Sequence, residues 1–127
     1  VMRVLLDTHV ALWTFTNDKR ISSIRSLILS EDVEVFISVA SSWKLAIQSE
    51  MGKIDISIPA FRQAIIDSGF IELPVNGLHT ESLLSLPPCH NDPFDRMLVA
   101  QAISEPMRLI TTNATLTQYG ELIWPLK

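Results

Sequence analysis

The 127-residue sequence lacks the residues that several common functional sites need. Its single cysteine, Cys89, cannot form an intramolecular disulfide and argues against a zinc cluster, as expected in a reducing compartment. The three histidines, His9, His79 and His90, do not have zinc-ligand spacing, and we interpret each as a surface or helix-end residue. The four glycines form neither a P-loop nor a dinucleotide-binding fingerprint, and there is no G-x-S-x-G elbow.

Positive charge and long apolar runs are also scarce. Ten basic residues against fourteen acidic residues give a net charge of −4, so the overall charge does not indicate nucleic-acid binding, although a local site could still bind RNA. We find neither a signal peptide nor an apolar run long enough to cross a membrane, and therefore expect a cytoplasmic protein without a membrane partner. With 47% hydrophobic and 19% charged residues, the sequence predicts one globular domain over residues 1–127.

Short strand patterns alternate with helical patterns along the whole sequence. Strands are expected at 3–6, 33–37, 70–73, 108–111 and 122–124, and helices at 8–15, 22–29, 39–51, 59–67, 78–86 and 93–104. This alternation predicts an α/β fold, with a mostly parallel sheet of four or five strands between helices on both faces. In the 39–51 helix, Trp43, Ile47 and Met51 form an apolar stripe that we expect in the core.

Polar residues occur where strands end and where a late helix begins. They come from four segments of the sequence: Asp7, Ser38, Asp92 with Asp95, and Thr111 with Thr112 and Asn113. Ligands bind at the carboxyl ends of the strands in parallel sheets, so these four segments are expected to meet at one edge.

The stretch HNDPFDR at 90–96 has two interpretations. Aspartate is a favoured N-cap, Pro93 suits the first helical position, and Asp95 in the first turn complements the helix dipole. Alternatively, Asp92 and Asp95 are metal ligands. Clustered carboxylates repel one another unless a cation lies between them, and oxygen ligands suit Mg²⁺ or Mn²⁺, which can activate water for phosphodiester hydrolysis.

The remaining polar candidates also have ordinary structural interpretations. Asp7 could cap the helix that follows it, but Thr8 can do so instead, which favours a ligand role for Asp7. Arg96 either binds a substrate phosphate or, as we favour, pairs with Asp92.

Three residues at the end of the 108–111 strand have similar alternatives. Thr111 and Thr112 are ordinary strand residues by default, although their hydroxyls could orient a water ligand. Asn113 is by default a turn residue.

Four runs, VLLDTHVALW, SVASSWKLAI followed by GKI, HNDPFDRMLVAQA and LITTN, resemble the PIN-domain family in order and spacing. The resemblance is strongest to the VapC-like toxins of bacterial type II toxin–antitoxin systems and covers essentially the whole sequence. DPFDRMLVAQA is its most specific part. The resemblance implies a three-layer α/β/α sandwich, Mg²⁺- or Mn²⁺-dependent ribonuclease activity, a homodimer, and a cognate antitoxin that blocks the site. The three tryptophans and a mean hydropathy of +0.27 also favour a homodimer.

The acidic site of the family can be carried over residue by residue. Its first aspartate matches Asp7, and the aspartate in the late helix matches Asp95, with Asp92 as an acidic companion. The position after the last long strand matches Asn113, where the family has Asp or sometimes Asn. The resemblance thus implies that Asp7 and Asp95 are the principal metal ligands.

Lys44 departs from the family pattern, because it occupies a position where this branch usually has glutamate. Ser41, Lys44 and Gln48 share one face of a helix, and this face lines the cleft if the resemblance holds. Lys44 is then either an ordinary solvated lysine or an ammonium held among the aspartates, where it supplies the charge that a metal otherwise brings.

Three functions remain open at this point. The first is a metal-dependent ribonuclease toxin with an acidic site, whose activity is attenuated by Lys44. The second is a catalytically disabled protein of the same fold that binds antitoxin or RNA, which Lys44 and Asn113 favour. The third, ranked low, is a phospho-acceptor receiver domain, because Asp7 stands alone where that class needs an acidic pair.

Overall fold

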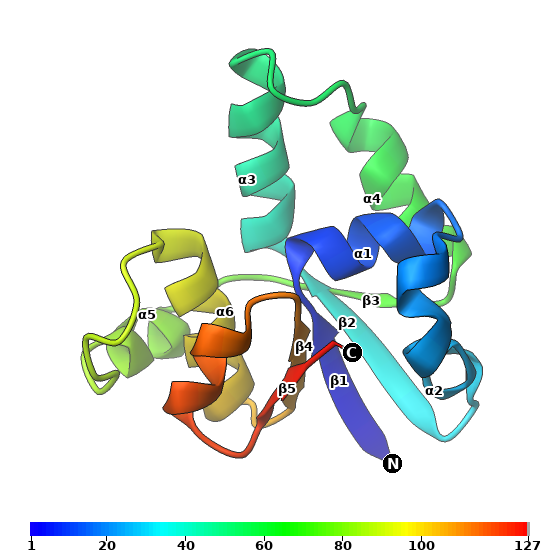
Figure 1. Cartoon of the computed structure of the whole chain (residues 1–127). Coiled ribbons are helices and arrows are strands. Elements are labelled where there is room, and N and C mark those ends of the chain that lie inside the picture. Colours follow the sequence, from blue (N-terminus) through cyan, green and yellow to red (C-terminus); the bar gives the residue numbers. More distant parts are fainter. Residues whose placement is uncertain (127) are drawn as a thin grey trace.

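The computed structural model describes residues 1–126, which form a five-stranded parallel sheet with helices on both faces (Figure 1). The strand order is β3-β2-β1-β4-β5, and every neighbouring pair is parallel. The strands are β1 (Met2–Leu6), β2 (Val33–Ser38), β3 (Ile71–Leu73), β4 (Arg108–Thr111) and β5 (Ile123–Pro125). The predicted α/β fold is confirmed, with β1 at the centre of the sheet.

Six α-helices and two 3₁₀ helices connect the strands within the described residues. They are α1 (Thr8–Phe15), η1 (Lys19–Ile24), α2 (Arg25–Leu29), α3 (Val39–Glu50), α4 (Ile58–Asp67), α5 (Gly77–Leu83), α6 (Pro93–Ser104) and η2 (Ala114–Tyr119). In Figure 1, α5 and α6 lie on one side of the sheet, whereas α1, α2 and α4 lie on the other.

Strand side chains alternate between two cores, because successive residues of a strand point to opposite faces. Leu5 and Leu109 pack in one core with Leu98 of α6, while Leu6 and Ile110 pack in the other with Val10 of α1. All of these side chains are buried. The two buried faces explain why the strands are continuously apolar, and they fix the carboxyl ends of β1 and β4 side by side.

Local caps shift some helix boundaries from the predicted ones. The predicted helix at 22–29 begins earlier, as η1, because the Asp18 side chain accepts a hydrogen bond from the Arg20 N–H. The predicted helix at 78–86 is shorter and begins at Gly77, because Asn76 and His79 form a capping box. His79 is therefore a helix-end residue as interpreted, but it is fully buried and not on the surface.

The expectation that Trp43, Ile47 and Met51 belong to the core is wrong. Trp43 is 62% exposed and Met51 is 59% exposed. Helix α3 instead buries Ala40 and Leu45 together with serines, so it packs inward through small residues and turns its largest side chains outward. No helix among the described residues is both long and apolar enough to cross a membrane.

Candidate active site at the carboxyl edge of the sheet

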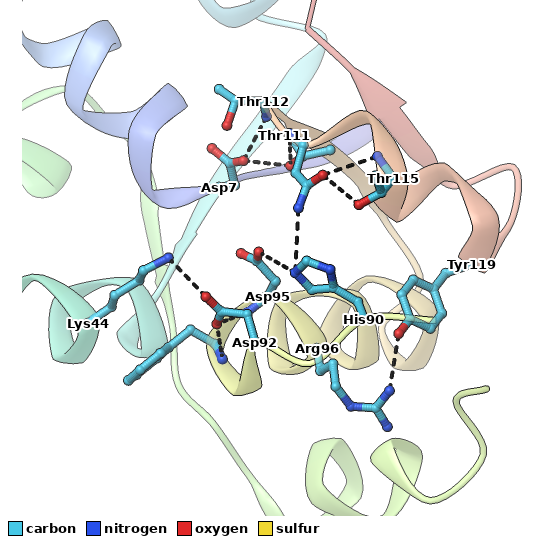
Figure 2. A network of polar contacts seen from close by, with 12 residues as sticks. Asp7, Lys44, His90, Asp92, Asp95, Arg96, Thr111, Thr112, Thr115 and Tyr119 are labelled. Carbon is cyan, nitrogen blue, oxygen red and sulfur yellow. Dashed lines mark hydrogen bonds and ion pairs between the residues drawn. The ribbon is translucent and has the colours of Figure 1, made fainter. Parts of the chain in front are cut away.

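Asp7 follows β1 directly, and hydrogen bonds to three neighbouring groups fix its carboxylate. Oδ1 accepts a hydrogen bond from the Val10 N–H at 3.0 Å, while Oδ2 accepts from the Thr111 hydroxyl at 2.6 Å and the Thr112 N–H at 2.8 Å. The residue is 5% exposed. One carboxylate therefore connects the ends of β1 and β4 to the start of α1 (Figure 2).

The cap of α1 is Asp7 and not Thr8, which corrects the sequence-based argument. Asp7 has the extended backbone of an N-cap residue, whereas Thr8 already belongs to the helix. The Thr8 hydroxyl instead donates to Ser41 Oγ at 3.0 Å, and both side chains are buried. Thr8 and Ser41 thus hold α1 against α3, and the capping role of Asp7 does not exclude a ligand role.

Asn113 ends the segment after β4 and caps η2. Its Oδ1 accepts hydrogen bonds from the Thr115 N–H at 3.1 Å and the Thr115 hydroxyl at 2.6 Å. Its own N–H donates to Thr111 Oγ1 at 3.0 Å. The amide oxygen that could serve a metal is consequently engaged by Thr115, which agrees with the default interpretation of Asn113 as a turn residue.

Asp92 and Asp95 open α6 but have different contacts. Asp92 is the N-cap, since its Oδ1 accepts from the N–H groups of Phe94 at 2.8 Å and Asp95 at 3.2 Å. Asp95 lies in the first turn, and its Oδ2 lies 3.0 Å from His90 Nε2. Hence Asp92 has the capping geometry predicted for it, and the carboxylate of Asp95 is oriented by a side chain.

Lys44 forms an ion pair across the site. Its Nζ lies 3.6 Å from Asp92 Oδ2, and its side chain is only 16% exposed. Figure 2 shows the amine of Lys44 directed at Asp92, on the same side as Asp95. Lys44 is accordingly not an ordinary solvated lysine, and its ammonium occupies space beside the carboxylates.

Arg96 does not pair with Asp92, so the favoured interpretation of this residue is wrong. Its guanidinium donates to the Tyr119 hydroxyl and to the Pro87 carbonyl oxygen, each at 3.1 Å. Figure 2 shows it pointing away from Lys44 and Asp92. Arg96 therefore links the segment before α6 to η2 through hydrogen bonds and does not face the carboxylates.

His90 is the residue of the site that the sequence analysis missed. Its Nε2 lies between Asp95 Oδ2, at 3.0 Å, and Asn113 Nδ2, at 3.5 Å. Thr111 links Asp7 to the backbone N–H of Asn113, and the Asn113 amide group contacts His90, so these residues connect Asp7 to Asp95. Because His90 Nε2 carries either a proton or a lone pair, its contacts with Asp95 and with the Asn113 amide group are alternative hydrogen bonds. A histidine within the HNDPFD run, close to the start of α6, was the signal that could have identified it.

The donor types suit a hard cation, but their arrangement does not. Carboxylate oxygens are the ligands that Mg²⁺ and Mn²⁺ prefer. Residues 1–126 nevertheless contain no group of three or more His, Cys, Asp and Glu side chains arranged to hold a metal ion. Asp92 Oδ1 is used for capping and Asp92 Oδ2 faces Lys44. With Lys44 in place, the site therefore does not fit a metal held jointly by the three aspartates.

Comparisons with known proteins agree with this architecture. Residues 4–122 match the PIN domain family. The chain is 28% identical over 119 residues to Ribonuclease VapC22 of Mycobacterium tuberculosis (strain ATCC 25618 / H37Rv), covering 91% of each protein. Its fold is similar to those of VapBC2 from Rickettsia felis bound to a promoter DNA fragment (TM-score 0.70, 17% identity, 97% of each chain) and DNA-bound VapBC from Salmonella typhimurium (TM-score 0.70, 18% identity, 100% of each chain). The chain belongs to the PIN domain family.

Proposed function

We propose that this protein is the metal-dependent endoribonuclease toxin of a type II toxin–antitoxin pair, with its activity attenuated by Lys44. The observation that carries the proposal is the Asp7 carboxylate, held at the carboxyl end of the central strand and connected through Thr111, Asn113 and His90 to Asp95. Membership of the PIN domain family and similarity to a ribonuclease support this assignment.

In this proposal the protein residues have distinct roles. Asp7 and Asp95 would be the principal ligands of Mg²⁺ or Mn²⁺. Asp92 and Asn113 would assist only once their oxygens are released, Asp92 from the Lys44 ion pair and Asn113 from the Thr115 hydrogen bonds. A bound divalent ion would supply an activated water and would neutralise charge on the phosphate. The N–H of Thr112 orients Asp7, whereas His90 orients Asp95. We place this activity in the cytoplasm.

Lys44 opposes metal binding in two ways. Its ammonium pairs with Asp92, so that this carboxylate is less available to a cation. It also repels an incoming divalent ion, and this repulsion is weakly screened because the side chain is mostly buried. We therefore expect low ribonuclease activity in the chain as it stands.

The proposal predicts a metal requirement. RNA cleavage by the protein should increase with added Mn²⁺ or Mg²⁺ and stop when EDTA is added. Asp95→Asn should abolish this metal-stimulated cleavage because it removes a charged ligand. Asp67→Asn is the matched control, since Asp67 is an exposed aspartate at the end of α4. Cleavage that continues unchanged in EDTA would contradict metal dependence.

The proposed partners are a cognate antitoxin and a second copy of the chain. The solved structures of similar fold from Rickettsia felis and Salmonella typhimurium are VapBC assemblies bound to DNA, which supports an antitoxin partner. A groove of about 360 Å³ between α3, α5 and α6 supports an apolar interface. Its lining is Val39, Ala40, Trp43, Val75, Leu83, Pro93, Phe94 and Met97.

A homodimer should have a mass of twice 14.2 kDa in light scattering at micromolar concentration. Trp43→Ser should shift the protein to the monomer mass, because Trp43 is largely exposed and packs edge-on against Phe94 in the groove. Met51→Ser is the control, as Met51 is similarly exposed at the end of α3 but does not line the groove. A monomer at micromolar concentration in the unmodified protein would overturn the dimer.

A catalytically disabled binding protein remains the second candidate. The Lys44–Asp92 pair and the engagement of the Asn113 amide oxygen by Thr115 favour it. The receiver-domain alternative is wrong, because the observed strand order β3-β2-β1-β4-β5 differs from the 2-1-3-4-5 order of flavodoxin-like receivers.

A further inference from the structure

A small cavity lies next to Thr112, the residue whose N–H contacts Asp7. It has a volume of about 230 Å³ and is lined by Trp13, Arg20, Thr112 and Leu126. Thr112 belongs to both places, since it lines the cavity and its N–H donates to Asp7 Oδ2 at 2.8 Å. Whatever occupies the cavity therefore lies next to the proposed active site.

Two of the residues that line this cavity are stacked on each other. The guanidinium carbon of Arg20 lies 4.0 Å from the centre of the Trp13 ring, and the Arg20 side chain is 57% exposed. The exposed ring of His9 lies 6.1 Å from Trp13. We call Trp13 and Arg20 the stacking platform. Trp13 is partly buried against the core, so the guanidinium of Arg20 is the more exposed planar group of the two. Nucleobases stack on arginine planes in single-stranded RNA complexes.

Asp18 holds the platform in one orientation. It accepts two hydrogen bonds from the guanidinium, from Nε at 3.0 Å and from Nη2 at 2.8 Å. The side-chain hydrogen bond from Arg20 lowers the pKa of Asp18 to about 2, so the pair persists at neutral pH. The two hydrogen bonds favour one orientation of the guanidinium plane, which reduces the entropy lost on binding.

The ion pair between Asp18 and Arg20 also indicates which part of a nucleotide would bind to the platform. Asp18 offsets the charge of Arg20, so the platform is a weak site for a phosphate alone. Its planar surfaces suit the uncharged face of a base. Along α1, Trp13 lies six residues beyond Asp7, about 9 Å at 1.5 Å per residue, so one strand could reach both places.

We propose that the stacking platform binds an unpaired base of single-stranded RNA beside the site of cleavage. This inference rests on the proposed ribonuclease function, because it names a subsite for the same substrate. It predicts that RNA binding depends on the planar shape of the Arg20 guanidinium and not only on its charge. It also predicts that double-stranded RNA, whose bases are already stacked and paired, does not use the platform.

The test measures binding without cleavage. A fluorescein-labelled, mixed-sequence single-stranded RNA dodecamer is titrated with the protein in EDTA, and affinity is read by fluorescence anisotropy at fixed salt. Arg20→Ala should bind at least about fivefold more weakly, since it removes the planar group on which the base stacks. Arg20→Lys should lose a similar amount, because lysine keeps the charge without the plane. RNA should quench the tryptophan fluorescence of the unmodified protein, and this quenching should be smaller in Trp13→Phe, because that variant lacks the tryptophan of the platform.

Arg62→Ala is the matched control. Arg62 forms the same two-point pair with Glu72, at 2.8 and 2.9 Å, and its side chain is also 57% exposed. Its variant should bind RNA as the unmodified protein does. Thermal unfolding of every variant checks that the fold is intact. If Arg20→Ala does not fold, the comparison of RNA affinity is made with Arg20→Lys.

Several outcomes would overturn the inference. The first is that the unmodified protein does not bind the dodecamer. The second is that Arg20→Ala and Arg62→Ala lose the same affinity for it, or that Arg20→Lys keeps full affinity. The third is that Arg20→Ala weakens the binding of duplex RNA as much as that of single-stranded RNA. The proposed function is tested separately, by RNA cleavage in the Lys44→Glu variant. Cleavage by that variant with no effect of Arg20 would remove the subsite and leave the ribonuclease assignment in place.

Discussion

Lys44→Glu is expected to raise both metal affinity and RNA cleavage by at least about tenfold. The substitution removes an ammonium that lies 3.6 Å from Asp92 and adds a carboxylate on the same face of α3. The charge beside Asp95 therefore changes by two, and Asp92 is released from its ion pair. Changes to groups that merely support a metal ligand commonly alter affinity or activity 10–100-fold, so a substitution among the proposed ligands themselves should do no less. Mn²⁺ binding by calorimetry and RNA cleavage measure the two effects independently.

Two controls make this experiment specific. Lys53→Glu produces the same change in net charge at an exposed lysine after α3, and it should alter neither Mn²⁺ affinity nor cleavage. Adding Asp7→Asn to Lys44→Glu should abolish the gain, because it removes a principal ligand. If the unmodified protein already cleaves RNA as fast as Lys44→Glu, Lys44 does not obstruct the site and the attenuation proposal is wrong.

Asp7→Ala is expected to destabilise the protein by about 3 kcal/mol, apart from any effect on activity. The substitution removes an N-cap, typically worth about 1 kcal/mol, and leaves the Thr112 N–H and the Thr111 hydroxyl without their acceptor at the edge of the sheet. Urea unfolding of Asp7→Ala against the unmodified protein measures this difference.

The control for Asp7→Ala is Asp67→Ala. Asp67 accepts a single exposed hydrogen bond, from Gln63, so its loss should change the free energy of unfolding by less than about 0.5 kcal/mol. Asp7→Asn should cost less than Asp7→Ala, because the amide oxygen can still accept a hydrogen bond. A loss below about 1 kcal/mol in Asp7→Ala would show that the three bonds contribute little to stability.

The elements that the sequence predicted best have strong local signals at both ends. Helix α6 begins and ends where predicted, because Asp92 and Pro93 start it and Pro106 follows it closely. Strand β4 also has its predicted bounds, between Pro106 and Asn113. Such signals act over a few residues and can be read from the sequence without knowing what packs against them.

The contacts of the site were harder to predict, because they join segments that are distant in sequence. Asp7 and Thr111 are 104 residues apart, and nothing near Asp7 indicates that a threonine hydroxyl donates to it. Arg96 finds Tyr119 and a carbonyl oxygen in place of the nearby Asp92. Trp43 was placed in the core because helical periodicity identifies an apolar face without saying whether another element covers it.

The three hydrogen bonds to the Asp7 carboxylate bear on how a cell could become resistant to the proposed toxin activity. We expect loss of this carboxylate to remove the proposed activity and also to weaken the junction of α1, β1 and β4, which lowers the stability of the fold. In our proposal, a lysine at position 44 of α3 obstructs the same site, and it takes no part in the hydrogen bonds of Asp7 that hold the junction. If selection acts only against toxicity, loss of Asp7 and a lysine at position 44 are equally favoured. If the protein must also stay folded to bind the proposed antitoxin, selection should favour the change at position 44.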